Sequence, residues 1–428
     1  MKRVVISCLI LGAVCGLPVH AADVLSGLAS PEVSIVAPDL RSAQKISDME
    51  GNSNETLLAA YASLAAYESE TDDLAERTLR ESGWSLQRIK TEHGRFIIGT
   101  YQDGTHTVGM IGIAGTERKS DVLLNLRSDL VALDNSDYGR VHEGYQKIAE
   151  EVFTAPLTQQ MLAALPQRVI ITGHSLGGAV AHLVGMKCAN GGAVSRQQLR
   201  IITFASPDMG DKKLLDALAH YPSVNYVMNA DVIPNLIHWL GKGYGTNPND
   251  VQWDIHTPPI RFPHAMIRFL DEAWYQSALT FPTVLQSRKQ SEIYVSSPEI
   301  EERISMSPEL RRAYRSTAIR SINLPKGMSV YREYQQQTLS QACKQARAQG
   351  ARELIWLPLA VYPDKENPLR TYGLQVSIVR YDLEKCEVRS WESHVLKQGK
   401  YTLFPLLHAY MHAFGNKIEE RPRKDLSQ

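Results

Sequence analysis

The stretch that decides the fold is residues 168–185, which read R-V-I-I-T-G-H-S-L-G-G-A-V-A-H-L-V-G. Its first part, residues 169–172, is rich in β-branched side chains and predicts a short, buried parallel strand. Residues 173–177 fit the pattern G-x-S-x-G, and residues 179–186 continue as a small, apolar helix. A strand, a sharp turn and a helix in this order present a nucleophilic serine at the edge of a sheet.

The spacing of the glycines has a physical reason. Gly173 and Gly177 lack Cβ atoms, so the strand and the helix can approach each other closely. The sharp turn predicts a strained backbone at Ser175, with the hydroxyl exposed as a candidate nucleophile. The helix begins directly after this serine and directs free N–H groups at the same place. We therefore expect the N–H of Leu176 to donate to a developing oxyanion.

A serine hydroxyl needs a base, and the base needs an orienting carboxylate. On an α/β-hydrolase scaffold the acid and then the histidine follow the serine along the chain. Asp231 comes just after the expected strand 224–228 and precedes Val-Ile-Pro, which would end the strand and hold the carboxylate at its edge. We take Asp231 as the candidate acid, the alternative being an aspartate that only begins a turn.

Three histidines beyond Asp231 are candidate bases. His264 follows a proline and opens an apolar helical segment, so its imidazole would lie at a loop-to-helix junction near the sheet edge. His256 lies in a proline-flanked loop. His238 is so close to Asp231 in the chain that its imidazole could not easily face the carboxylate. We favour His264 and keep the other two as alternatives. His174, inside the G-x-S-x-G motif, is expected to pack structurally.

Strands and helices alternate through the first part of the chain. This order predicts an α/β fold with a mostly parallel sheet and helices on both faces. The expected strands are 85–90, 95–101, 107–113, 169–172, 199–205 and 224–228, and the expected helices include 55–68, 72–81, 179–186 and 212–219.

Length and composition bound the possibilities. The chain has 428 residues, enough for two domains. Its 46 basic and 46 acidic residues balance, so the charge gives no indication of a nucleic-acid partner. Residues 1–21 read as a signal peptide: Lys2 and Arg3 precede a short apolar run and a small-x-small cleavage site before Ala22. The apolar run is too short to span a bilayer comfortably. We therefore expect secretion to the periplasm or the extracellular space.

Three cysteines remain once a signal peptide is removed. Cys188 lies on the helix after the serine and is expected to be a small buried hydrophobic residue. Cys343 and Cys386 could pair in an oxidising compartment, which the sequence leaves open because it does not give their geometry. Three widely spaced cysteines do not make a metal site, and we expect neither metal nor cofactor.

Four further motifs accompany residues 173–178. They are Gly115-Thr116, His142-Glu143-Gly144-Tyr145, Phe204-Ala205-Ser206-Pro207 with Gly210, and Asp231-Val232-Ile233-Pro234. Together the five resemble the motif set of the class 3, fungal-type triacylglycerol lipases, over about residues 55–270.

The resemblance implies an α/β-hydrolase fold and a role for each candidate residue. It implies that Ser175 is the nucleophile, Asp231 the acid and His264 the base. It also implies that Thr116 is the second oxyanion donor beside Leu176. The segment after Thr116 corresponds to the family's lid, and its leucines would cover the serine in water and meet lipid when open.

The resemblance stops at about residue 290, so we expect a hydrolase domain at 22–290 and a separate domain at 291–428. Residues 291–320 are charged and are expected to be helical. The remaining pattern predicts strands at 329–334, 354–361, 374–382 and 387–394 and helices at 339–349 and 404–414, with the last three strands forming an antiparallel meander. This small α+β domain carries no catalytic constellation and would bind a partner, whose identity is unknown, or stabilise the fold.

These observations predict a secreted serine hydrolase that cleaves carboxylic esters of lipids through a Ser-His-Asp triad and an acyl-enzyme, at a membrane or lipid interface. Two other esterase functions remain open: a phospholipase A1 that acts on membranes, and a non-lipid carboxylesterase. A protein of another class is also open, namely an envelope or surface binding protein whose C-terminal domain is the functional part.

Overall fold

The computed structural model describes residues 53–67, 74–103, 106–116, 129–133, 136–229, 231–234, 243–257, 263–280, 292–298, 300–302, 306–322, 330–363, 372–398 and 401–419. The expected signal peptide, residues 1–21, lies outside them. Contacts divide the chain beyond residue 38 into two compact units. The first unit contains Asp39–Ile255 and Arg261–Leu270, and the second contains His256–Ile260 and Asp271–Gln428. The division falls inside helix α12 (Met266–Thr280), whereas the boundary expected at residue 290 lies outside the described residues.

The first unit is built on a mostly parallel sheet, as the sequence predicts. Its strands in the described residues are β1 (Ser85–Lys90), β2 (Arg95–Asp103), β3 (His106–Ile113), β6 (Arg168–His174), β7 (Leu199–Phe204), β8 (Ser223–Met228) and β9 (Asp250–Trp253). They lie side by side in the order β1-β2-β3-β6-β7-β8-β9. Every pair from β3 onward is parallel, and β1, β2 and β3 pair antiparallel at one edge. A short antiparallel pair, β4 (Leu130–Ala132) and β5 (Arg140–His142), stands apart from this sheet.

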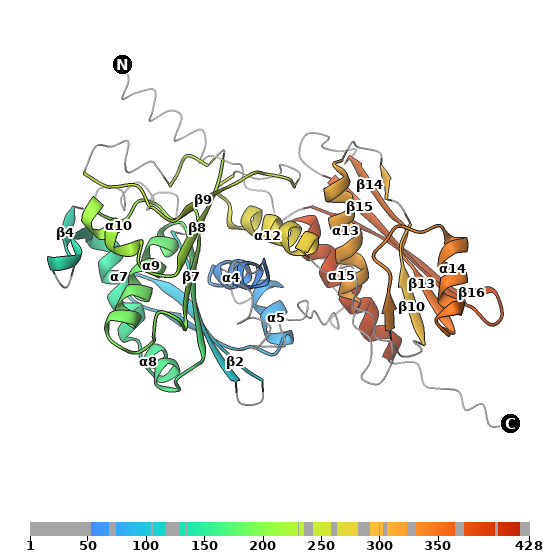
Figure 1. Cartoon of the computed structure of the whole chain (residues 1–428), viewed down its shortest axis with the longest axis horizontal. Helices are drawn as coiled ribbons and strands as arrows, with labels where there is room; N and C mark the ends of the chain where they lie inside the picture. The colour runs from blue at the N-terminus through green and yellow to red at the C-terminus, as the bar shows by residue number, and fades with distance from the viewer. Residues whose placement is uncertain are drawn as a thin grey trace, which may run out of the picture. The chain divides into compact units, whose positions relative to one another are not determined.

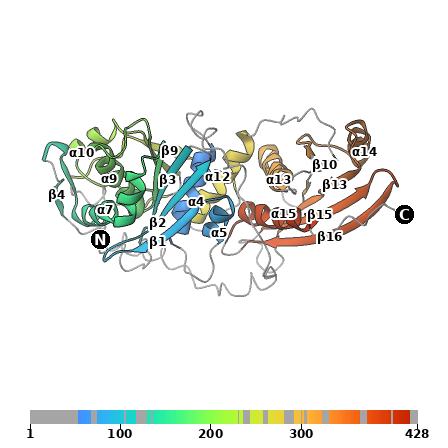
Figure 2. The ribbon, with the colours of Figure 1, turned by 90° about the horizontal axis from the view of Figure 1, so that it is seen from below.

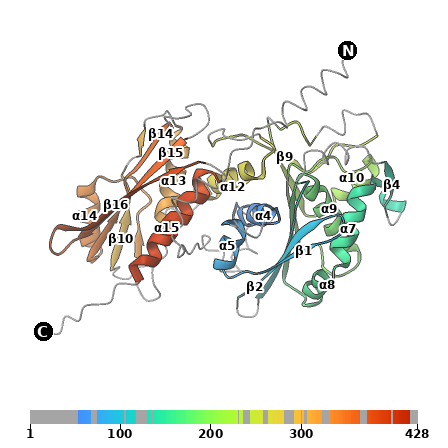
Figure 3. The same cartoon turned by 180° about the vertical axis from the view of Figure 1, so that it is seen from behind.

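Helices cover both faces of this sheet (Figure 1, Figure 3). On one face lie α7 (Glu143–Thr154), α8 (Pro156–Ala163), α9 (Leu176–Asn190) and α10 (Lys212–Leu218), and on the other lies α4 (Ser53–Ala65), followed in the chain by α5 (Leu74–Glu81). Successive side chains of β6 point to opposite faces of the sheet, so the strand contacts helices on both sides. Ile171 packs in the core with α7 and α9, whereas the hydroxyl of Thr172 lies 2.8 Å from that of Ser63 on α4. Strand β6 is buried throughout, as a central parallel strand requires.

The second unit contains a mixed sheet with helices on both faces (Figure 1, Figure 2). Its strands in the described residues are β10 (Ile293–Ser296), β11 (Glu301–Glu302), β12 (Val330–Arg332), β13 (Glu353–Trp356), β14 (Leu359–Pro363), β15 (Tyr372–Asp382) and β16 (Glu387–Lys397). The helices are α13 (Pro308–Ser321), α14 (Leu339–Ala348) and α15 (Leu403–Glu419). Helix α14 packs on β10 and β13 through a small apolar core around Tyr294 and Leu354.

The strand pairing of this unit agrees with the sequence prediction, whereas its first elements differ from it. The antiparallel meander is confirmed, because β15 pairs antiparallel with β13, β14 and β16. Its first strand is split at Pro358, since proline has no N–H to donate within a sheet. The prediction that residues 291–320 are helical is wrong for their first part, where β10 and β11 precede α13. Strand β10 is buried between parallel β12 and β13, and its Ile-Tyr-Val composition suits that central position better than a helix.

No helix among the residues described is both long and apolar enough to cross a membrane.

Candidate active site

The serine motif forms a strained turn between β6 and α9. Ser175 has φ 56° and ψ −130°, a conformation that costs a residue with a side chain about 1–3 kcal/mol. The two flanking glycines make the turn possible. A Cβ on Gly173 would lie 2.2 Å from the carbonyl oxygen of Gly177, and a Cβ on Gly177 would lie 2.3 Å from that of Ile113. A larger residue at either position would force the backbone to shift, so the close approach expected from the sequence is present.

The structure brings the three predicted triad residues together in the first unit. His264 Nε2 lies 2.9 Å from Ser175 Oγ, and His264 Nδ1 lies 2.8 Å from Asp231 Oδ2. The other carboxylate oxygen of Asp231 accepts a hydrogen bond from the N–H of Ile233 at 3.0 Å. The Asp231 side chain is fully buried, whereas that of His264 is 15% exposed. A fixed carboxylate therefore faces one side of the imidazole, and the serine hydroxyl faces the other.

Chain connections explain why these residues meet. Asp231 follows β8, and its N–H donates to the carbonyl of Met228, so the turn holds the carboxylate at the carboxyl edge of the sheet. His264 lies in the turn just before α12. The alternative base His256 instead bonds Glu272 Oε1 through Nδ1 at 2.7 Å, in the second unit. The other alternative, His238, lies outside the described residues.

His174 takes part in the site through a contact that the sequence does not reveal. Its Nε2 lies 2.6 Å from the carbonyl oxygen of His264, and its Nδ1 lies 2.9 Å from the hydroxyl of Tyr67. Burial, with a smaller contribution from nearby His264, holds the pKa of His174 well below its usual value, so the ring is neutral. A carbonyl only accepts, so Nε2 carries the single proton and Nδ1 accepts from the tyrosine hydroxyl. His174 thus holds the backbone of His264.

Tyr67 is absent from the sequence-based candidates. It lies in the turn after α4, 107 residues before His174. The indirect signal is Gly115, where a Cβ would lie 2.1 Å from the tyrosine hydroxyl and 3.2 Å from Ser175 Cβ. A glycine in a Gly-Thr pair at the end of a strand therefore marks a crowded place beside the nucleophile.

Of the two expected oxyanion donors, Leu176 directly follows the serine, and Thr116 directly follows a glycine that lies close to it. Leu176 is the first residue of α9, where N–H groups lack partners within the helix. Thr116 follows Gly115, which approaches Ser175 closely. Residues 117–128, which include the expected lid, lie outside the described residues.

A buried polar network supports the turn from behind. A Cβ on Gly178 would lie 2.9 Å from Ser206 Cβ, and the N–H of Ser206 donates to Asn225 Oδ1 at 2.9 Å. Asn225 Nδ2 in turn donates to Asp250 Oδ1 at 2.7 Å. Burial raises the pKa of Asp250 to about 6, with the Asn225 hydrogen bond opposing that rise. The Phe-Ala-Ser-Pro motif therefore packs against the first turn of α9.

The cysteines and one cluster of possible metal ligands lie outside the triad. Cys188, Cys343 and Cys386 are free thiols. Cys188 is buried, and burial raises its pKa to about 12, as expected for a small hydrophobic residue. Among the described residues one group could hold an ion, namely Glu92, His93 and Glu151. There His93 Nδ1 already lies 2.5 Å from a Glu151 oxygen, on an exposed turn, and we assign no metal to it.

Comparison with known proteins gives a consistent result for the segment that contains the serine. Residues 110–240 match the family described as lipase (class 3). A lipase of Caenorhabditis elegans is 37% identical over 119 residues, covering 26% of this chain and 32% of that protein. A lipase of Rhizopus niveus is 32% identical over 123 residues, covering 25% of this chain and 30% of that protein. The chain thus spans about a third of the length of these relatives.

Solved structures similar to this chain include the triacylglyceride lipase of Rhizomucor miehei, which is 17% identical and has a TM-score of 0.41. The match covers 50% of this chain and 81% of that one.

Proposed function

We propose that the protein is a serine hydrolase that cleaves carboxylic esters of lipids, because residues 110–240 match the class 3 lipase family. One observation carries this proposal. A serine on a strained turn lies 2.9 Å from an imidazole, and that imidazole lies 2.8 Å from a buried carboxylate. This arrangement suits acyl transfer, because it activates a hydroxyl that is a weak nucleophile by itself.

The proposed reaction has two halves. His264 Nε2 takes the proton of Ser175 Oγ as the oxygen attacks the ester carbonyl, and Asp231 stabilises the imidazolium that forms. The N–H groups of Thr116 and Leu176 bind the oxyanion of the tetrahedral intermediate. His264 then gives its proton to the leaving alcohol, which leaves an acyl-enzyme. Water, deprotonated by the same imidazole, releases the fatty acid and restores the serine. The chemistry needs no cofactor.

His174 and Tyr67 would act as positioning residues in this scheme. The neutral ring of His174 bonds the carbonyl of His264, so the backbone that carries the base is held in place. The low pKa of His174 also keeps it from acquiring a second positive charge beside the imidazolium. These two residues touch no substrate in the proposed mechanism.

The decisive experiment replaces the nucleophile. We expect Ser175→Ala to abolish hydrolysis of short p-nitrophenyl esters without lowering the melting temperature by more than about 2 °C. Ser195→Ala is the matched control, since that exposed hydroxyl lies beyond the other end of α9. Retained turnover in the Ser175 variant would refute the assignment.

A substrate panel then separates the esterase functions. Hydrolysis of emulsified triglyceride supports a lipase, hydrolysis of phospholipid at the sn-1 ester supports a phospholipase A1, and activity only on soluble short esters supports a carboxylesterase. We also propose secretion through residues 1–21, with 22–290 as the hydrolase domain and 291–428 as a separate domain. N-terminal sequencing of exported protein would give Ala22 first, and an intact Met1 would contradict export by cleavage.

A further inference from the structure

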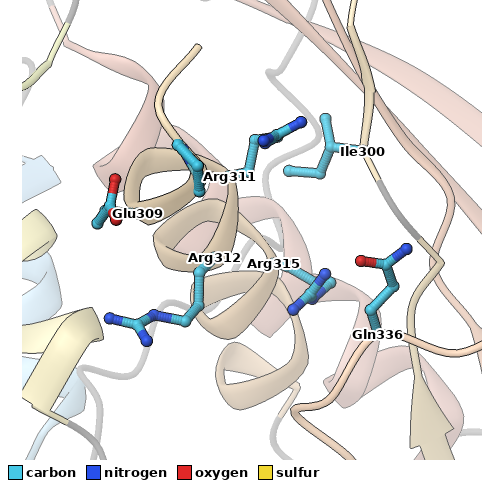
Figure 4. A pocket seen from close by; sticks show the side chains of 7 residues that line it. Ile300, Glu309, Arg311, Arg312, Arg315 and Gln336 are labelled. Atoms are coloured by element: carbon cyan, nitrogen blue, oxygen red, sulfur yellow. The ribbon is translucent and has the colours of Figure 1, made fainter.

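The second unit contains a cavity of about 230 Å³ against α13. Its lining includes acidic and basic side chains of that helix (Figure 4), namely Glu309, Arg311, Arg312 and Arg315. Arg311 and Arg315 already interact with other groups of the protein, and Arg315 Nη2 donates to the carbonyl of Tyr334 at 3.4 Å. We therefore assign no ligand to this cavity. The reactive groups of the unit that have no role so far are two thiols beside α14.

Cys343 and Cys386 share one neighbour, the guanidinium group of Arg347. Cys343 and Arg347 are four residues apart on α14, so their side chains are neighbours on one face of the helix, with Cβ atoms about 5–6 Å apart. Arg347 Nη2 donates to Cys386 Sγ at 2.7 Å. The arginine therefore connects the helix that carries one thiol to the turn that carries the other.

The turn between β15 and β16 is held against α14 (Figure 1). Nε and Nη2 of Arg347 donate to the carbonyl of Leu383 at 3.3 and 3.2 Å. The N–H of Leu383 donates to the carbonyl of Arg352, just beyond the end of the helix, at 2.9 Å. The side chain of Leu383 belongs to the same apolar core against which Cys343 packs. Leu383 thus brings the turn to the side of α14 that carries Cys343.

The backbone of Cys386 has a conformation that is unusual for its residue type. Its φ is +59°, in the left-handed region that favours glycine, and it is the last residue before β16. Asp382 Oδ1 fixes this turn by accepting the N–H groups of Glu384 and Lys385, each at 3.0 Å. An exposed cysteine is therefore held in a strained position where glycine would fit more easily, and such outliers are typical of functional sites.

The two thiols differ in their surroundings. Cys386 is exposed, whereas Cys343 is only partly exposed. Burial raises the pKa of the Cys343 thiol, Arg347 opposes that rise, and Cys386 adds to it. A cation beside a sulfur favours the thiolate, which is the form that attacks a disulfide. Cys386, exposed and in contact with Arg347, is therefore placed to react first, and Cys343 to react second.

We propose that Cys343 and Cys386 form an intramolecular disulfide by exchange with a small-molecule disulfide such as oxidised glutathione. The thiolate of Cys386 attacks one sulfur of the reagent, which breaks its S–S bond, releases one thiolate and leaves a mixed disulfide on Cys386. The thiolate of Cys343 then attacks the sulfur of Cys386 and releases the second half of the reagent. The protons of the two cysteines go to the two released thiolates, and the two electrons that the cysteines lose reduce the reagent to two thiols.

The bond would tie α14 to the turn between β15 and β16. It closes a loop of about forty residues, and a cross-link of this length stabilises a fold mainly by restricting the unfolded chain. The proposal does not depend on the proposed hydrolase function, because both cysteines lie in the second unit and outside the triad. Disulfides persist in oxidising compartments, so the proposed export would expose this pair to conditions in which the bond forms.

The test treats the full, reduced chain with oxidised glutathione under native conditions. Tryptic peptides analysed by mass spectrometry without reduction should contain Cys343 linked to Cys386. The melting temperature should rise by about 5–10 °C, and dithiothreitol should reverse the rise. Cys188→Ala is the matched control, because that buried thiol lies in the first unit and its loss should change neither the link nor the rise.

Variants of the three side chains test the order of the two steps. Cys343→Ser should stop at the mixed disulfide of Cys386 with glutathione, and it should show no rise in melting temperature. Arg347→Gln should slow the reaction about ten-fold at neutral pH, and Arg347→Lys should restore most of the rate because it keeps the charge. Equal rates in Arg347→Gln and the parent would overturn the role of the arginine. Glutathione adducts without the link between the two cysteines, or a link that forms only after unfolding in urea, would overturn the proposal.

Discussion

Replacing Asp231 by asparagine tests the proposed triad through its tautomer. Asp231 accepts two hydrogen bonds, one from His264 Nδ1 and one from the N–H of Ile233. Asparagine has the same shape but only one acceptor oxygen, and its NH2 group donates. One of the two partners must therefore face an NH2 group. Which partner does so decides whether the imidazole remains a base.

The N–H of Ile233 settles the orientation. It is part of the backbone and cannot become an acceptor, so an NH2 group facing it leaves a hydrogen bond unmade at a cost of about 1–3 kcal/mol. The favoured arrangement directs the asparagine oxygen to Ile233 and the NH2 group to His264 Nδ1. The imidazole proton then moves to Nε2, which can no longer accept the proton of Ser175. This free-energy difference leaves about one molecule in ten to one in a hundred with a competent tautomer.

The lost charge reduces the rate further. The imidazolium formed during the reaction no longer has an anion against Nδ1, so we expect kcat to fall about a thousand-fold or more in total. The assay is steady-state hydrolysis of p-nitrophenyl butyrate, with thermal unfolding measured in parallel. Asp254→Asn is the matched control, since its exposed carboxylate accepts a hydrogen bond from the Asn229 side chain and is no part of the proposed triad. A folded Asp231→Asn enzyme within about ten-fold of the parent would refute the tautomer argument.

Three further outcomes follow from the same geometry. His174→Phe should lower kcat about ten-fold at unchanged KM, because it frees the backbone of the base; an altered KM alone would indicate a binding role. Gly177→Ala should destabilise the fold by about 1–3 kcal/mol, because the added Cβ meets the Ile113 carbonyl. Gly192→Ala is the control and should cost less, because nothing lies within 4 Å of its added Cβ, although its φ is +71°. The stabilising protonated form of Asp250, with its pKa raised to about 6, is lost as pH rises from about 4 through 6. Asp250→Asn should therefore unfold at higher temperature than the parent above pH 6 but not at pH 4 or below, and a pH-independent difference would contradict this.

The candidate nucleophile could be predicted because its requirements are local. The strand, the turn and the helix around Ser175 are adjacent in the chain, and glycine is needed wherever backbone meets backbone. Asp231 and His264 are predicted less directly, from their places after a strand and before a helix. Tyr67 could not be predicted, since the expected helix 55–68 ends at Ala65 and the residue lies in the turn that follows. Contact with His174 depends on tertiary structure alone.

The helix predicted for the first part of residues 291–320 is wrong because the contacts that decide this structure are distant in the chain. Residues 291–320 are charged overall, which hides the short apolar run Ile293–Ser296 that forms β10. A central strand needs few residues when its neighbours supply the remaining burial, and β12 and β13 lie 34 or more positions further along the chain. Local composition carries no information about such partners, so the helical pattern of α13 was extended too far towards the N-terminus.

Helix α12 makes the separate roles of the two units testable. The first part of the helix, with Phe269 and Leu270, belongs to the first unit, and Trp274 belongs to the second. Trp274 is fully buried, and its ring centroid lies 5.0 Å from that of His408 on α15. A chain that ends at residue 290 keeps Trp274 but loses α15. A buried aromatic side chain covers about 150–250 Å², so roughly 4–6 kcal/mol of apolar burial is lost at this one position.

The truncated chain should therefore bind a hydrophobic dye and aggregate, and Trp274→Arg in the truncated chain should reduce both effects. Turnover per active site, counted with a serine-reactive phosphonate, should equal that of the full chain, because all three proposed triad residues precede residue 270 and belong to the first unit. A soluble, folded truncated chain that reacts with the phosphonate but no longer hydrolyses ester would contradict this reasoning. It would place part of the reaction in the second unit, and the proposal that residues 291–428 are a domain separate from the hydrolase would have to be abandoned.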